Sequence, residues 1–142
     1  MLHRTALILL ALMTGNEVCV AAFVMPTLRS LPEDAQGQPA AKLAAVLGRW
    51  MPFVYGMSLI LTGAVVFLGH RAAGAWPIRA VGSLGLQVLI LIMTLGWMLP
   101  INNRLARMRT PYGGWLDEAR RWDNLHRVRV VLLLVAVFAL AT

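Results

Sequence analysis

The sequence predicts an all-α fold: a bundle of four transmembrane helices that forms a single integral membrane domain over residues 1–142. Hydrophobic residues make up 59% of the chain and charged residues only 13%, which is far from the balance of a soluble domain. Four stretches are apolar enough to cross a bilayer, and most charged residues crowd against the end of the third and the start of the fourth. Trp50 and Trp97 lie near span ends, as interfacial aromatic residues do.

The first predicted span covers residues 5–25, between Arg4 and Pro26. The connection that follows, residues 30–49, contains Pro32-Glu33-Asp34, which is typical of a helix start because Pro fits the first turn and acids suit the positive end of the helix dipole. Alanines and leucines then recur at helical spacing. This pattern predicts a short amphipathic helix that lies at the membrane interface between spans 1 and 2.

The remaining spans are predicted over residues 51–69, 78–99 and 122–142. A Gly- and Ala-rich turn joins the second to the third, and Pro100 is expected to end or kink the third. Residues 101–121 are polar and predict an amphipathic connection. The uninterrupted apolar run of the fourth span, residues 130–141, is shorter than the roughly 20 residues that a span needs. We therefore expect part of the cluster at residues 123–129 to lie at or just inside the membrane boundary, where ionisable groups are paired, functional or snorkelling.

Positive charge is unevenly distributed along the chain. Lys and Arg number 13 against 6 acids, and because they flank apolar spans we expect lipid contact and no nucleic-acid binding. One side of the predicted membrane carries only Arg4, Arg71 and Arg79. The positive-inside rule therefore places both long connections in the cytoplasm and both termini outside, in what we expect to be a bacterial inner membrane. The positive residues on the cytoplasmic side are Arg29, Lys42, Arg49, Arg104, Arg107, Arg109, Arg120, Arg121, Arg127 and Arg129.

Trp122, His126 and Arg129 are spaced i, i+4, i+7 and share one face of the fourth predicted helix. They present an aromatic plane, an imidazole and a fixed cation along one line. Such a face can hold an aromatic, anionic ligand and move a proton near neutral pH. The alternative is an interfacial flank with a belt tryptophan, a snorkelling arginine and a solvated histidine.

Glu17 lies in the middle of the first span, where a carboxylate is costly and marks a functional-site hypothesis. Either desolvation keeps it protonated, or it faces a polar cavity and meets a cation such as Arg104, Arg127 or Arg129. The structural alternative is a buried Glu–Arg pair that fixes helix register without chemistry. The neighbouring Asn16 is suited to an interhelical hydrogen bond.

Asn102 and Asn103 follow Pro100, where the helix loses part of its regular hydrogen bonding. Their amides could cap the freed backbone groups or point at a ligand. Both alternatives remain open from the sequence.

No metal centre is predicted, because the histidines lack ligand spacing and a single cysteine excludes both an internal disulfide and a cysteine cluster. No phosphate-binding loop, Ser/His/Asp signature or redox cysteine pair is present either. The sequence leaves a bound haem or metal ion, and a homo-oligomer, open. The residues concerned are His3, His70, His126 and Cys19.

Three segments form a recognisable combination. They are the end of the first span, Val24-Met25-Pro26-Thr27-Leu28; the end of the third, Leu99-Pro100-Ile101-Asn102-Asn103-Arg104-Leu105; and the opening of the fourth, Arg121-Trp122-Asp123-Asn124-Leu125-His126-Arg127-Val128-Arg129. Together they resemble the anthrone oxygenase-like family of small four-helix membrane proteins. Named members of that family are fungal enzymes that oxidise anthrones to anthraquinones without an evident organic cofactor, and most bacterial members are uncharacterised.

This resemblance implies a membrane-embedded, cofactor-independent oxygenase that uses O₂ as co-substrate on a hydrophobic aromatic or phenolic small molecule. It implies that His126 is a base or proton shuttle, that Arg129 stabilises an oxyanion, and that Glu17 partners His126 or an arginine. Trp122 would be a stacking wall. The other substrate-binding side chains that we expect are Asn102, Asn103, Arg104 and Asn16.

A second class of function stays open: a non-catalytic small membrane protein, either a transporter or an accessory subunit. In that case Glu17 and the arginines form a buried network that relays protons or fixes assembly. A cavity large enough for two or three fused rings between the first and fourth helices would favour the oxygenase. Its absence would favour the second class.

Overall fold

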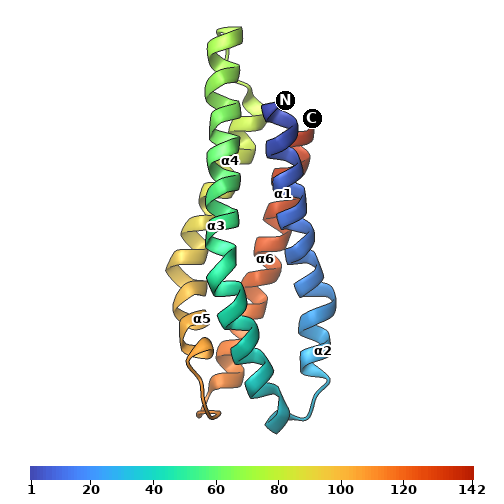
Figure 1. Ribbon diagram of the computed structural model, residues 1–142, viewed down its shortest axis with the longest axis vertical. Helices are drawn as coiled ribbons and strands as arrows, with labels where there is room; N and C mark the ends of the chain where they lie inside the picture. The colour runs from blue at the N-terminus through green and yellow to red at the C-terminus, as the bar shows by residue number, and fades with distance from the viewer.

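The computed structural model describes all 142 residues as four long helices with no strand (Figure 1). Leu2–Arg29, Glu33–Ala73, Ile78–Ala106 and Trp115–Ala141 are each long and apolar enough to cross a membrane. Both termini lie at one end of the bundle, and the connections at residues 30–32 and 107–114 lie at the other (Figure 1). The predicted all-helical fold with four apolar spans is confirmed.

Two of the four long helices contain a π-helical turn, in each case just before a proline. The first consists of α1 (Leu2–Cys19), η1 (Val20–Val24) and α2 (Met25–Arg29), and the third of α4 (Ile78–Met93), η2 (Thr94–Met98) and α5 (Leu99–Ala106). Proline lacks an N–H and its ring clashes with the carbonyl four residues earlier. The wider π turn accommodates both effects at Pro26 and Pro100. Pro100 therefore interrupts the α-helical hydrogen bonding without ending the third helix, which continues to Ala106.

The second helix differs from the sequence-based expectation. The predicted interfacial helix between spans 1 and 2 is not separate: residues from Glu33 onward form one helix with the second span, α3 (Glu33–Ala73), despite two internal prolines. The small apolar face of its first half, Ala40, Ala41 and Ala44, is buried in the bundle core instead of facing the membrane surface. This face is thus buried by packing against neighbouring helices, and does not lie on the membrane–water interface as expected. Gly74, with φ of 68°, ends the helix in the left-handed conformation.

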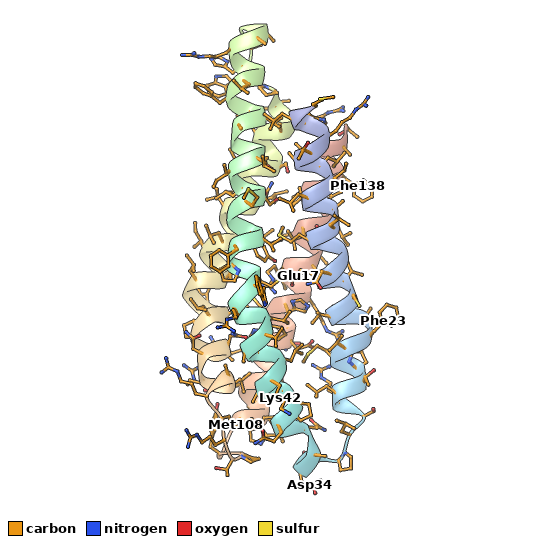
Figure 2. All side chains as sticks on the ribbon, viewed as in Figure 1. Glu17, Phe23, Asp34, Lys42, Met108 and Phe138 are labelled. Atoms are coloured by element: carbon orange, nitrogen blue, oxygen red, sulfur yellow. The ribbon has the colours of Figure 1, made fainter.

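The bundle core has two apolar clusters stacked along its length. One includes Leu10, Ile90 and Leu133 in the half that holds the termini, and the other includes Ile101 and Trp115 in the opposite half. Large apolar side chains cover the outside, as expected of lipid-facing helices. Phe23 and Phe138 point away from the bundle, whereas Glu17 lies inside it (Figure 2). The buried ionisable groups of α1 and α6 (Trp115–Ala141) lie where these two clusters meet.

Two buried polar contacts fix the relative positions of the helices. Asp123 of α6 is fully buried and accepts hydrogen bonds from Arg29 of α2 and from Arg127. Gln87 of α4 lies among three hydroxyl groups and is hydrogen-bonded to all of them. Those hydroxyls belong to Ser58, Thr62 and Ser83.

The 107–114 connection is tied to the start of α6 by side chains outside the apolar spans. The Tyr112 hydroxyl and the Arg104 guanidinium both donate to Glu118. Partial burial, together with the hydrogen bond to Glu118, raises the pKa of Tyr112 above its ordinary value. Tyr112 therefore stays protonated, and remains a donor, throughout the physiological pH range.

Candidate active site

Glu17, His126 and Arg129 meet between α1 and α6. The Glu17 Oε2 atom lies 2.5 Å from Arg129 Nη2 and 3.0 Å from His126 Nδ1. The same Arg129 nitrogen lies 3.0 Å from His126 Nδ1, so the three atoms form a closed triangle. The three side chains are 3%, 0% and 7% exposed. Of the two alternatives for Glu17, the structure shows the second: it meets a cation, and that cation is Arg129.

The surroundings of His126 define what its protons can do. Its Nε2 lies 3.2 Å from the backbone carbonyl of Glu17, so Nε2–H donates to that oxygen. Nδ1 then accepts from Arg129 when the ring is neutral, or donates to the Glu17 carboxylate when the ring is protonated. Trp122 covers the ring, with centroids 4.9 Å apart and planes at 14°. Since protein atoms engage both nitrogens, His126 can exchange a proton with Glu17 and does not itself reach a ligand.

A cavity of about 200 Å³ lies against this cluster, walled by α3, by the third helix around η2, and by side chains of α1 and α6. Three residues that line it each carry a buried polar atom that forms no regular hydrogen bond with a protein group: the Tyr55 hydroxyl, the Thr94 hydroxyl and Arg129 Nε. Tyr55 is 7% exposed and Arg129 6%. An unsatisfied buried polar group costs about 1–3 kcal/mol, so three such groups on one wall mark a place built for a polar partner.

Local sequence explains how this wall is built. The π turn η2 ahead of Pro100 carries Thr94 at its first position, and such turns are frequent at functional sites. Gly48 lets α5 approach α3, because a Cβ there would lie 2.5 Å from the Asn102 side-chain nitrogen. That nitrogen donates to the Ala44 carbonyl at 3.1 Å. Asn102 therefore binds a backbone carbonyl of α3 at the edge of the cavity that it lines.

A second cavity, of about 410 Å³, lies nearer the end of the bundle that holds the 30–32 and 107–114 connections. Side chains of α2, α3, α5 and α6 form its walls, and most of them are apolar. Leu47, Asn102 and Trp122 line both cavities. The two cavities are therefore neighbours that share these three wall residues.

The structure brings together five of the eight predicted site residues and leaves three outside. Glu17, His126, Arg129, Trp122 and Asn102 form or line the site. The other three line neither cavity: Asn103 is exposed, Arg104 pairs with Glu118, and Asn16 lies on the surface 3.6 Å from the Met51 sulfur.

Tyr55 and Thr94 line the site but do not stand out in the sequence. The available signal was a hydroxyl-bearing side chain deep within an apolar span, which needs a partner in the bilayer interior. Tyr55 was the clearer of the two. Its ring also receives the Arg129 guanidinium, with Cζ 5.5 Å from the ring centroid.

No group of three His, Cys, Asp or Glu side chains is arranged to hold a metal ion. The other two histidines lie at the end of the bundle that holds the termini, where His3 bonds the Leu140 carbonyl and His70 stacks on Trp76. The side chains at the cavity supply instead a carboxylate that can accept a proton, a guanidinium that can stabilise an anion, and neutral hydrogen-bonding groups. This set suits the deprotonation of a weakly acidic molecule.

Comparison with known proteins gives one match. The family model described as anthrone oxygenase matches residues 49–139, a range that contains Tyr55, Asn102, His126 and Arg129 but not Glu17. No curated protein matches the chain, and no solved structure does. Because the match covers well over half of the sequence and agrees with the resemblance noted from the motifs, the chain belongs to the anthrone oxygenase family.

Proposed function

We propose that this protein is a membrane-embedded oxygenase that binds a phenolic, anthrone-like aromatic molecule in the cavity beside Glu17 and oxidises it with O₂, without an organic cofactor. One observation carries the proposal. Tyr55, Thr94 and Arg129 line the same cavity as Glu17, and each carries a buried side-chain polar atom that forms no regular hydrogen bond with a protein group. A ligand with a polar oxygen on an aromatic frame would satisfy these groups and place its acidic hydrogen near Glu17.

The geometry supports a separate chemical role for each of the three side chains. Glu17 takes the proton from the substrate and can pass it to His126 Nδ1, 3.0 Å away, so that the carboxylate is restored. Arg129 touches Glu17 and faces the cavity, so it stays beside the negative charge as that charge moves to the substrate oxygen. Deep burial excludes bulk water and strengthens both interactions.

The deprotonated substrate then reacts with O₂ directly. One electron passes from the carbanion to O₂, the resulting radical pair combines to form a C–O bond, and the peroxide anion takes up the proton to give a hydroperoxide. Loss of water converts the former CH₂ into a carbonyl. For anthrone the balance is anthrone + O₂ → anthraquinone + H₂O, in which four electrons leave the carbon and reduce one O₂.

The location of the protein is also a proposal. The positive residues Arg29, Arg104, Arg120 and Arg127 belong to the part of the bundle opposite the termini. By the positive-inside rule we place that end in the cytoplasm, the termini outside, and the protein in a bacterial inner membrane. Membrane lipid would surround the bundle.

The direct test is anaerobically prepared protein in lipid nanodiscs, mixed with anthrone and O₂, with O₂ consumption compared with that of nanodiscs lacking protein. We expect Glu17→Gln and His126→Ala to abolish the protein-dependent rate. Asp117→Asn and His70→Ala are matched controls, since the Asp117 side chain is 82% exposed and His70 lies far from the site. Wild-type protein no faster than empty nanodiscs, or full turnover by both site variants, would refute the proposal.

Tyr55→Phe gives a sharper test because it removes only a hydroxyl that makes no regular hydrogen bond, although the hydroxyl is close enough to interact with Glu17. Loss of that group should therefore change the unfolding midpoint only slightly. A hydrogen bond to substrate is worth about 0.5–1.5 kcal/mol, so KM should rise by about two- to tenfold. A lower unfolding midpoint with unchanged kinetics would assign the hydroxyl a structural role.

The non-catalytic alternative has two observations in its favour. Glu17, His126 and Arg129 satisfy much of one another's hydrogen bonding. The cavity beside them is walled mainly by α3 and the third helix, and so is not the cavity between the first and fourth helices that would have favoured the oxygenase. A buried network of this kind can fix assembly without chemistry. Under that alternative the wild type consumes no O₂ with anthrone. Loss of stability in Glu17→Gln is expected under both alternatives, so O₂ consumption by the wild type separates them.

A further inference from the structure

The cavity beside Glu17 lies between two hydrogen-bonded contacts that join α3 to the third helix. On the side toward the termini, Gln87 of α4 is hydrogen-bonded to the hydroxyls of Ser58 and Thr62. On the other side, Asn102 of α5 donates to the Ala44 carbonyl. Between these contacts α3 packs closely against α4 and α5 but not against η2, and the third helix bows away from it (Figure 1). The cavity occupies this loosely packed stretch.

Local sequence explains why the two helices separate there. Pro52 of α3 has no N–H to donate to the preceding turn. Across the cavity, the third helix forms the π turn Thr94–Met98, whose backbone is wider than that of an α turn. Gly56, one turn after Pro52, adds no side chain, and a Cβ there would meet nothing within 4 Å. The gap is therefore built by the backbone of both helices.

The cavity reaches the outer surface of the bundle at this gap. Of the residues that line it, only Pro52 and Leu95 are exposed, and they belong to its two sides. The nearby Phe53 and Ile92 are 74% and 57% exposed and form part of the apolar outer surface. A residue that both lines a cavity and is exposed lies at its mouth. The mouth therefore lies between α3 and η2, in a surface that a bilayer would cover with acyl chains.

The mouth and the interior of the cavity differ in polarity. Pro52 and Leu95 at the mouth are apolar, whereas the carboxylate of Glu17 and the guanidinium of Arg129 lie on the buried inner wall. A charged molecule is expensive to place in hydrocarbon, and no polar group at the mouth would compensate it. A molecule that arrives by this way is therefore neutral, and it meets charged groups only once it is inside.

We propose that the gap between α3 and η2 is a lateral portal, through which a neutral aromatic molecule dissolved in the bilayer enters the cavity. This inference rests on the proposed function for the nature of the ligand and for the membrane location. It adds the phase from which the ligand is drawn and its charge state: a phenol enters with its proton and loses it only beside Glu17. Gly56 and Leu95, at the two sides of the portal, then determine which molecules pass.

The test measures how a collisional quencher reaches Trp122, which lines the cavity and is 8% exposed. Protein with Trp122 as its only tryptophan is placed in phosphatidylcholine nanodiscs. Iodobenzene dissolves in hydrocarbon and should quench Trp122. 4-Iodobenzoate is the same ring with a charge, and should quench about fiftyfold less or weaker still, because the bilayer interior excludes charge. The substitutions that leave one tryptophan are Trp50→Phe, Trp76→Phe, Trp97→Phe and Trp115→Phe.

Variants of this protein locate the way in. Gly56→Phe places a ring at the mouth of the cavity and should remove most of the quenching by iodobenzene. Leu95→Phe narrows the mouth from η2 and should reduce it as well. Gly63→Phe is the matched control, because Gly63 lies two turns further along α3, outside the cavity, and its Cβ would also meet nothing within 4 Å. Ala119→Phe obstructs the larger cavity instead and should have no effect.

A second readout separates a blocked portal from a misfolded protein. Misfolding would expose Trp122 to water and raise its quenching by 4-iodobenzoate, whereas a blocked portal leaves that value unchanged. If Gly56→Phe misfolds by this criterion, Leu95→Phe decides the question from the other side of the mouth.

The outcomes divide as follows. Absence of quenching by iodobenzene overturns the portal, and so does quenching that the variants at the mouth leave intact. Quenching that Ala119→Phe abolishes overturns it too, since the quencher then arrives through the larger cavity. Quenching through the portal in a protein that consumes no O₂ with anthrone rejects only the oxygenase. An active oxygenase whose Trp122 quenching ignores Gly56→Phe rejects only the portal.

Discussion

The Glu17–Arg129 contact should respond very differently to the loss of one partner and to the loss of both. Glu17→Gln leaves the Arg129 guanidinium, a residue only 6% exposed, next to a neutral amide. Arg129→Met leaves the carboxylate beside a thioether. The double variant replaces the charged pair by groups of similar volume and leaves no uncompensated charge.

The magnitudes follow from the geometry. At 2.5 Å and an effective dielectric constant of about 20, the attraction between the two charges is about 7 kcal/mol. Desolvation offsets much of it, because the two side chains are only 3% and 7% exposed and each ion loses several kcal/mol of hydration. Removal of one partner keeps the other's desolvation cost and should lower the free energy of unfolding by about 3–5 kcal/mol. The double variant should lie within about 1–2 kcal/mol of the wild type.

The assay is unfolding by sodium dodecyl sulfate in mixed micelles, followed by tryptophan fluorescence for the wild type, both single variants and the double variant. The exposed pair Arg104–Glu118 gives the matched control cycle, because its side chains are 52% and 29% exposed. That pair should couple only weakly, since water and salt screen exposed charges. Two results would refute the assignment of a buried ion pair. One is a coupling free energy for Glu17–Arg129 similar to that for Arg104–Glu118. The other is a double variant whose loss of unfolding free energy equals the sum of the losses in the two single variants.

Two further predictions concern packing between helices. Gly48→Ala should displace Asn102 from its contact with α3 and lower the unfolding midpoint, whereas Gly63→Ala, whose Cβ meets nothing within 4 Å, should be neutral or stabilising in the same assay. A neutral Gly48→Ala would show that Asn102 can move at no cost. Gln87→Leu removes the acceptor and donor that join α3 to α4, and it should lower the free energy of unfolding by about 0.6–2 kcal/mol in micelles. An unchanged or raised value would mean that the buried hydroxyls find other partners.

Sequence patterns predicted the fold class because a bilayer imposes a strong local rule. Each span must satisfy its own backbone hydrogen bonds and carry enough apolar residues to cross. The four helices were therefore visible from composition alone. Their bounds were less so, since Pro26 and Pro100 were expected to end or kink the first and third helices, whereas a π turn carries each helix through its proline.

Members of the candidate site could be predicted from the sequence where burying the residue in an apolar span costs free energy, or where helical periodicity put several polar residues on one face. Glu17 stood out because a carboxylate in mid-span needs a partner, and the face shared by Trp122, His126 and Arg129 followed from helical periodicity. Neither argument could choose among the arginines. Three cations were candidates for Glu17, and two of them proved to bind other acids.

The sequence by itself determined that this chain forms four helices long and apolar enough to cross a membrane, one of them with a carboxylate in its middle, because hydropathy and periodicity are properties of each segment taken alone. Only the tertiary structure decided that Arg129 is the partner of Glu17, that His126 lies behind the carboxylate, and that Tyr55 and Thr94 complete the cavity wall. Those facts depend on the rotation and depth of each helix relative to its neighbours. Side-chain packing across the whole bundle sets both, and no single segment encodes them.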